Sequence, residues 1–164
     1  AGNIRAVELE FNELSGDWWK YYDATAHTKQ AYLAYEDSPL TVSAGKPDIV
    51  RELASGHWGR KLFVGDGVSD LRTRDSVDLF VGFGGVARRE KVESGADVYI
   101  YSNSLAPVLP MAVGQPGISG LRGTPYQATL ELGLGLCQEP HSVGFRNQSL
   151  LDAFQTSLLN ETAQ

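Results

Sequence analysis

The stretch Lys61-Leu-Phe-Val-Gly-Asp-Gly-Val-Ser-Asp70 is an apolar run that stops at a glycine-rich turn carrying two carboxylates. The run at 62–64 is typical of a short buried strand, and Asp66 follows it between two glycines. In open α/β sheets, ligands bind outside the carboxyl ends of the strands. Carboxylate oxygens such as those of Asp66 and Asp70 are the ligands that Mg²⁺ prefers. The stretch therefore predicts an α/β sheet with an acidic ligand site at the end of this strand.

Around this stretch, strand and helix patterns alternate, which is the signature of a parallel sheet. Pro47 suits the first turn of a helix, and Gly56 suits the position just after its end. Further strands are expected at 77–81 and 97–101, and helices at 69–74, at 86–93 and from 104 onward. The predicted fold class is α/β with a parallel sheet.

The front of the chain has a different pattern. Residues 7–11 alternate apolar and polar side chains with the period of a half-buried strand. Residues 31–35 are expected to extend a hairpin with the turn and aromatic cluster at 16–23. We expect a small antiparallel excursion within residues 7–35. The aromatic cluster 18–22 is interpreted as a packing surface on it.

The last third also departs from the alternation. Pro107, Pro110, Pro116 and the glycines between 114 and 123 predict an extended connection. Helices are predicted at about 124–137 and 150–159. The second of these carries an apolar stripe, which must pack on its own sheet or on another subunit.

Composition excludes some functions. The chain has 164 residues and a formal charge of −6, without a basic stripe, which argues against nucleic-acid binding. No run approaches the roughly 18 apolar residues of a membrane span. Cys137 is the only cysteine, so no intrachain disulfide forms, and its apolar neighbours predict a buried thiol. We expect a soluble protein of the cytoplasm or of an organelle interior, with the compartment left open.

Three segments in order resemble the haloacid dehalogenase superfamily, in its phosphoserine phosphatase-like branch. They are Gly45-Lys46, Gly65-Asp-Gly-Val-Ser-Asp70 and Phe83-Gly84-Gly85. The resemblance runs from about Ile4 to Leu109. It implies a three-layer Rossmann-like sheet, shortened at its N-terminal side, in residues 1–109. Residues 110–164 are expected to form the extended connection and a helical tail.

The resemblance implies roles for five residues. Asp66 and Asp70 would hold Mg²⁺, with Asp70 as an outer-sphere or second ligand. Lys46 would hold the transferring phosphoryl group, with Asp70 beside it in the catalytic set. Gly67 and Arg89 would also bind phosphate, although the neighbouring Arg88 leaves the register open. Without that resemblance, Asp66 and Asp70 are equally compatible with a turn and a helix cap, and Lys46 with a solvated side chain.

One feature of the resembling family is absent. Its enzymes use an aspartate nucleophile in an Asp-x-Asp motif, which forms an aspartyl-phosphate. The ten aspartates of this chain include no pair separated by one residue. The family's second motif, a strand ending in Ser or Thr, has no clear counterpart either. We therefore expect no aspartyl-phosphate chemistry from this chain alone and little bound Mg²⁺, which wants six oxygen ligands.

Three functions are compatible with these features. The leading hypothesis is a non-catalytic, phosphatase-derived structural or accessory subunit. It would contact other protein chains through the sheet edge, the aromatic cluster 18–22 and the helix 150–159. The second is half of a Mg²⁺-dependent phosphomonoesterase whose nucleophile lies on another chain. The third is a phosphate-ester binding module that uses the loop ends as an anion nest.

Overall fold

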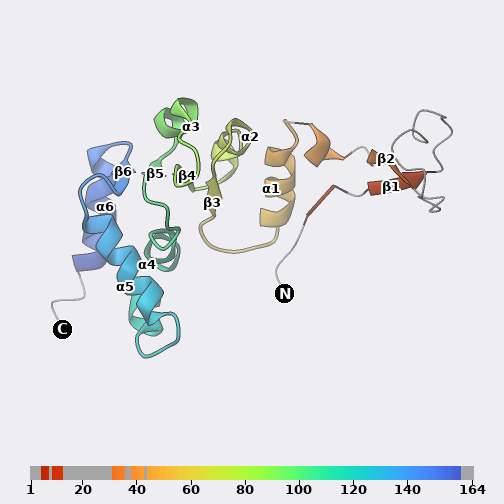
Figure 1. The fold of residues 1–164 in the computed structure, drawn as a ribbon. Coiled ribbons are helices and arrows are strands. Elements are labelled where there is room, and N and C mark those ends of the chain that lie inside the picture. Colours follow the sequence, from red (N-terminus) through yellow and green to blue (C-terminus); the bar gives the residue numbers. More distant parts are fainter. Residues whose placement is uncertain (1–4, 8, 13–30, 36–37, 43, 160–164) are drawn as a thin grey trace, which may run out of the picture.

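The computed structural model describes residues 5–7, 9–12, 31–35, 38–42 and 44–159, and its centre is a four-stranded sheet. The strands lie in the order β3 (Leu62–Gly65), β4 (Leu79–Phe83), β5 (Val98–Ile100) and β6 (Val143–Phe145). β3, β4 and β5 run parallel, and β6 is antiparallel to β5 (Figure 1). This mostly parallel open sheet confirms the predicted Rossmann-like α/β fold class.

Helices join the strands, as the alternation predicted. They are α1 (Lys46–Ala54), α2 (Val68–Leu71), α3 (Glu90–Gly95), α4 (Val108–Leu121), α5 (Gln127–Gln138) and α6 (Gln148–Leu159), with 3-10 turns η2 (Pro39–Thr41) and η3 (Arg74–Ser76). Pro47 lies in the first turn of α1, and Gly56 has a positive φ of 75° just beyond its end. The signals read from these two residues therefore place α1 correctly.

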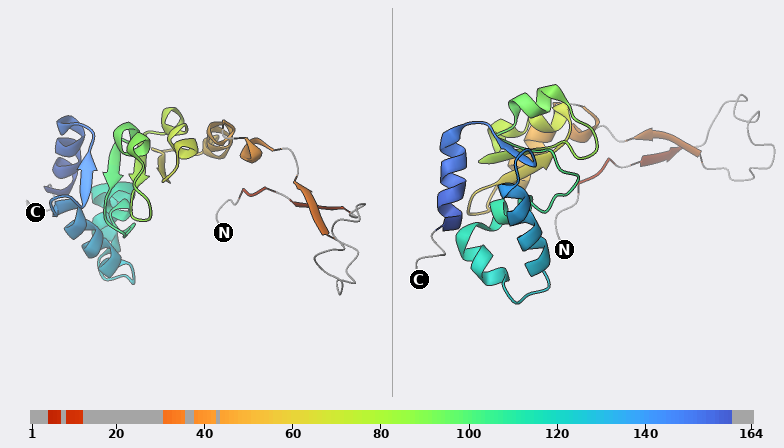
Figure 2. Two further views of the ribbon diagram at one scale, coloured as in Figure 1. Left: turned by 45° about the horizontal axis from the view of Figure 1, so that its top comes forward. Right: turned by 60° about the vertical axis from the view of Figure 1, so that its left-hand side comes forward.

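Both faces of the sheet are covered, because side chains alternate along each strand and the parallel strands bury both sides. Fully buried Phe80 packs on one face with Val92 of α3. Val81 points to the other face, where Val108 of α4 and Leu150 of α6 pack. The helices α4, α5 and α6 lie next to one another in Figure 2. The sheet is thus the middle layer of three.

The prediction of an extended connection between residues 107 and 123 is wrong, because most of this segment forms α4. Pro107 and Pro110 lie at its N-cap and first turn, where a missing N–H costs no intrahelical hydrogen bond. Gly114, with φ 58° and ψ −174°, interrupts the helix, and Pro116 lies in the first turn of the second part. The prolines that suggested an irregular connection therefore start two helical pieces.

The strand β6 was not predicted from the sequence. Val143–Phe145 pairs antiparallel with β5, opposite Val98–Ile100. The strand has only three residues, and Gly144 is its centre. Such a short run gives too few alternations to be distinguished from a loop.

At the front of the described chain, β1 (Leu9–Asn12) pairs antiparallel with β2 (Ala31–Tyr35). This confirms the expected antiparallel excursion within residues 7–35. The aromatic cluster 18–22 lies outside the described residues.

Part of the apolar stripe of α6 packs within the chain. Leu150 joins the core beneath the sheet, and the ring of Phe154 lies 5.3 Å from that of Phe145 on β6. The sequence predicted that this stripe packs on its own sheet or on another subunit, and part of it packs on its own sheet. Within the described part of the chain, no helix is both long and apolar enough to span a membrane.

Gly82 allows β4 and β5 to pack closely. A methyl group at this position would lie 2.5 Å from Cδ2 of Tyr99 and 3.1 Å from Cβ of Ala96. Tyr99 is 3% exposed and fills the core between the sheet and α3, so its ring has little freedom to move away. The side chain of Tyr99 therefore requires glycine on the neighbouring strand.

We expect Gly82→Ala to lower the free energy of unfolding by about 1–3 kcal/mol, because the added methyl overpacks the core against Tyr99. Urea unfolding followed by circular dichroism measures the change. The matched control is Gly120→Ala in α4, where a methyl group meets nothing within 4 Å. There the same substitution should leave stability unchanged or raise it by up to about 1 kcal/mol. Equal effects of the two substitutions would contradict the packing argument.

Candidate functional site

The loop at the carboxyl end of β3 folds back on itself within a few residues. A Cβ atom on Gly65 would lie 2.2 Å from Cβ of Asp70, so only glycine allows α2 to start this close to the strand. Helix α2 begins at Val68, directly after Gly67. This tight return places the side chain of Asp70 beside the end of β3.

Asp70 is the best-fixed acidic group of the loop. It is 9% exposed, and its carboxylate accepts a hydrogen bond from the backbone N–H of Gly67 at 3.0 Å. The same carboxylate pairs with Nζ of Lys46 at 2.5 Å, which ties α1 to the loop. Its backbone carbonyl accepts the hydroxyl of the fully buried Thr73 at 2.7 Å. Asp70 is therefore held from three sides.

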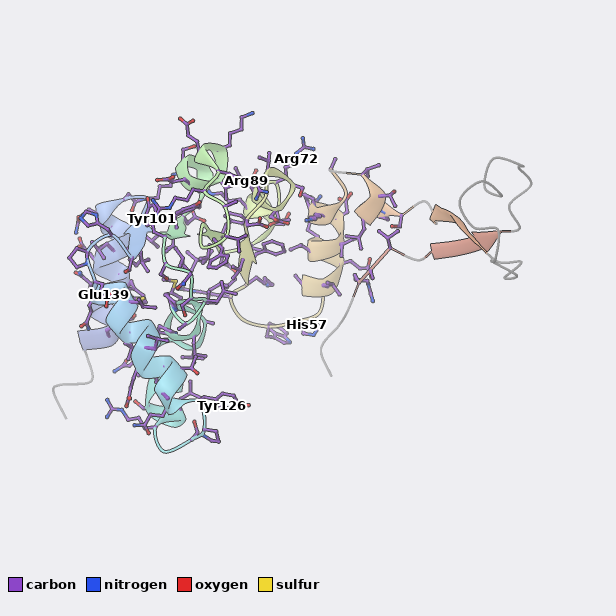
Figure 3. The ribbon with its side chains drawn as sticks, viewed as in Figure 1. His57, Arg72, Arg89, Tyr101, Tyr126 and Glu139 are labelled. Atoms are coloured by element: carbon purple, nitrogen blue, oxygen red, sulfur yellow. The ribbon has the colours of Figure 1, made fainter. Side chains whose placement is uncertain are left out.

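Asp66 is paired with the second candidate cation. Nη1 of Arg89 donates to Oδ2 of Asp66 at 2.5 Å and to its backbone carbonyl at 2.9 Å. Both side chains are about half exposed, at 51% for Asp66 and 46% for Arg89. Arg89 is the N-cap residue of α3, which follows the glycines after β4 (Figure 3). Adjacent parallel strands thus bring this pair together at one edge of the sheet.

The neighbouring Arg88 is engaged elsewhere. Its guanidinium lies 5.2 Å from the ring centre of Tyr101. The hydroxyl of Tyr101 donates to Oε1 of Glu93 at 2.9 Å, and burial together with this hydrogen bond raises the pKa of Tyr101. Because Arg88 lies on an aromatic ring, Arg89 is the arginine that reaches the loop.

The five predicted site residues lie around one loop, where four of them form two ion pairs and Gly67 donates its backbone N–H to Asp70. Two carboxylates meet two cations, so the cluster has no net charge. An incoming phosphate or metal ion would have to compete with these pairs for its ligands. The arrangement is a charge-neutral site at the carboxyl edge of the sheet.

The described residues do not by themselves fit Mg²⁺. Among them, no group of three or more His, Cys, Asp or Glu side chains lies close enough to hold a metal ion. Asp66 and Asp70 supply fewer oxygens than the six that Mg²⁺ requires, and both are already paired with cations. Any metal site at this loop needs further ligands.

An apolar rim around the site was missed by the sequence reasoning. Val68, Val86 and Leu105 are 42%, 87% and 51% exposed, and each lies in the segment that follows one of the three parallel strands. The sequence signal that could have revealed this rim is an apolar residue soon after the end of each strand, at a position expected to be polar. These side chains give the edge a surface suited to apolar contact.

The thiol of Cys137 takes no part in this site. Burial raises the pKa of Cys137 to about 11, so the group is protonated near neutral pH. The side chain is partly exposed, whereas the sequence predicted a buried thiol, and in its protonated form it is a weak nucleophile.

Comparison with known proteins identifies the ancestry of part of the chain. No family model matches. The chain is 35% identical over 66 residues to phosphoserine phosphatase of Bos taurus and 33% identical over 66 residues to that of Homo sapiens. It is 35% identical over 69 residues to the chloroplastic phosphoserine phosphatase of Arabidopsis thaliana. Each match covers 40% of this chain.

The matches cover only a part of those proteins. The chain spans 29% of the mammalian relatives and 23% of the plant one. The chain thus contains a phosphoserine phosphatase-like region of the haloacid dehalogenase superfamily, as its motifs indicated.

We expect Asp70→Ala to lower the free energy of unfolding by about 2 kcal/mol, because it leaves the partly buried N–H of Gly67 and the ammonium group of Lys46 without their acceptor. Thermal and urea unfolding measure the loss. Asp48→Ala is the matched control, since Asp48 pairs with Arg51 on the exposed face of α1, the helix that carries Lys46. That pair should contribute less than about 0.5 kcal/mol. An equally large loss of unfolding free energy in Asp48→Ala would mean that the Asp70 contacts stabilise the fold no more than an exposed ion pair does.

Proposed function

We propose that this chain by itself is a non-catalytic, phosphatase-derived subunit that works as a structural or accessory part of a larger assembly. The observation that carries the proposal is the pairing of Lys46 with Asp70 and of Arg89 with Asp66. Groups that would bind phosphate and metal in a phosphatase are bound to each other instead. The loop is thereby a stable structural element without any ligand.

The chemistry of the sequence supports the same conclusion. Phosphoryl transfer through a covalent intermediate needs a carboxylate nucleophile beside the metal ligand. No Asp-x-Asp pair is present in this sequence, and Asp66 is held by Arg89 through both its carboxylate and its backbone carbonyl. The carboxylates of Asp66 and Asp70 are thus occupied in structural contacts.

The role in an assembly is supported by the edge of the sheet. Within the described residues, β3 pairs with β4 only, so one row of its backbone groups has no strand partner. Proteins usually cover such an edge, because it pairs readily with another extended segment. The apolar rim at Val68, Val86 and Leu105 lies at the same end of the sheet as the Asp66 loop. A protein surface that contacts both the edge and the rim would remove them from water.

The same edge favours one second candidate, half of a phosphomonoesterase completed by another chain. A strand added parallel to β3 would have its carboxyl end at the same end of the sheet as Asp66. An aspartate at that end would lie beside the loop and supply the missing nucleophile and oxygen ligands. Asp66 and Asp70 would then hold Mg²⁺, and Lys46 and Arg89 would be available to bind phosphate. The rearrangement requires both ion pairs to open.

Hydrolysis of para-nitrophenyl phosphate in the presence of Mg²⁺ tests the proposal. The purified chain should show no turnover above that of its Asp66→Asn variant. Asp75→Asn, in the exposed turn η3, is the matched control for the loss of one carboxylate. Turnover that Asp66→Asn abolishes and Asp75→Asn preserves would overturn the non-catalytic proposal.

Native mass spectrometry of the protein from its natural source completes the test. We expect a complex that contains a second polypeptide besides this chain. If that complex hydrolyses the ester and loses activity with Asp66→Asn, the chain is half of an enzyme. A free monomer in its natural source would contradict a role in an assembly.

A further inference from the structure

A cavity of about 500 Å³ lies at the amino ends of the parallel strands, whereas the Asp66 loop lies at the carboxyl end of β3. It is bordered by Leu62, Leu79 and Val98, the first residues of the three parallel strands. The Asp66 loop follows the last residue of β3, so the two sites lie at opposite ends of the strands. The cavity is therefore separate from the phosphatase-like site.

Polar and apolar atoms contribute about equally to the wall of the cavity. Met111 of α4 and Phe154 of α6 belong to its apolar part, together with the first residues of the three parallel strands. Gly114, where α4 is interrupted, also lies in the wall and contributes no side chain. The break in α4 thus leaves space where a continuous helix of larger residues would fill it.

The mouth of the cavity carries an excess of positive charge. Lys61, Asp78 and Arg60 border it. The carboxylate of Asp78 accepts the backbone N–H of Lys61 at 2.7 Å, and Nζ of Lys61 donates to the carbonyl of Gly59 at 3.2 Å. The guanidinium of Arg60, by contrast, has no hydrogen bond or ion pair with any residue that the structure describes. An unpaired cation beside the apolar part of the cavity wall is complementary to an anion with an apolar body.

We propose that this cavity binds an amphiphilic monoanion, of the class of medium-chain carboxylates, with its carboxylate on Arg60 and its chain between α4 and α6. The volume lies within the range of about 300–1,000 Å³ that small-molecule sites occupy. A group the size of a water molecule takes about 30 Å³, so a chain of about ten carbons fits with room for its headgroup. Burial of the chain provides affinity, and the guanidinium provides the preference for an anion.

Isothermal titration of the full chain with decanoate, below its micelle concentration, tests the proposal. We expect saturable binding of one decanoate per chain. Arg60→Gln should weaken binding about tenfold, which corresponds to 1.4 kcal/mol. Arg51→Gln, an exposed arginine of α1 that does not border the cavity, removes the same charge and should change the affinity less than twofold. Equal weakening by both substitutions would overturn the proposal, because it would indicate general charge attraction.

A second pair of variants tests the location. Ala153→Trp places a large ring at the mouth of the cavity from α6 and should abolish binding. Ala128→Trp, at an exposed position of α5 away from the cavity, should leave it intact. Decan-1-ol should bind the wild type and Arg60→Gln equally, because it lacks the charge. Undiminished decanoate binding to Ala153→Trp would place the ligand elsewhere and overturn the proposal.

Repeating the titration over a tenfold range of protein concentration tests whether a second copy of the chain, and not a small molecule, occupies the cavity. Constant affinity for decanoate supports a small-molecule site. Affinity that falls as the protein concentration rises would mean that another copy of the chain fills the cavity, and it would overturn the proposal.

Discussion

The carboxylate of Asp70 is the contact on which the arrangement of this loop and of helix α1 depends. It accepts the N–H of Gly67, binds the ammonium of Lys46 and lies so close to Gly65 that no other residue fits there. The contact joins a helix that precedes the sheet to the loop after its edge strand. Because the group is nearly buried, its hydrogen bonds are little weakened by water. The loop is therefore a rigid corner of the fold, whether or not a ligand binds there.

The sequence predicts the fold where a pattern repeats and misses it where a segment is short. The apolar runs before Asp66 and at 97–101 identify β3 and β5, since β5 is buried and the side chains of β3 are partly buried against both core clusters. The strand predicted at 77–81 is Leu79–Phe83, because Val77 extends the apolar run but belongs to the turn before it. β6 has three residues and depends on pairing with β5, which no local pattern reveals. Tertiary contacts determine such elements.

The identity of the site residues is predictable, whereas their pairing is not. Spacing after the strands brings Lys46, Asp66, Asp70 and Arg89 to one edge, and the structure places all four there. That each carboxylate takes a cation from a different helix depends on loop geometry and on Gly65, which a linear motif does not encode. The choice of Arg89 over Arg88 depends on the ring of Tyr101, from a different strand. Motifs of this kind therefore locate a site and leave its electrostatic state open.

Among the residues that the structure describes, β3 pairs with β4 alone, and this free edge also bears on the solubility of the isolated chain. A row of free backbone N–H and C=O groups is a template for strands of other molecules, and this one is only four residues long. Repulsion between chains of net charge −6 opposes such contacts at neutral pH. The isoelectric point is about 5.0, so mild acid removes that repulsion while the edge stays in place. Precipitation near pH 5 would thus arise from the geometry of one strand, and a bound partner strand would suppress it.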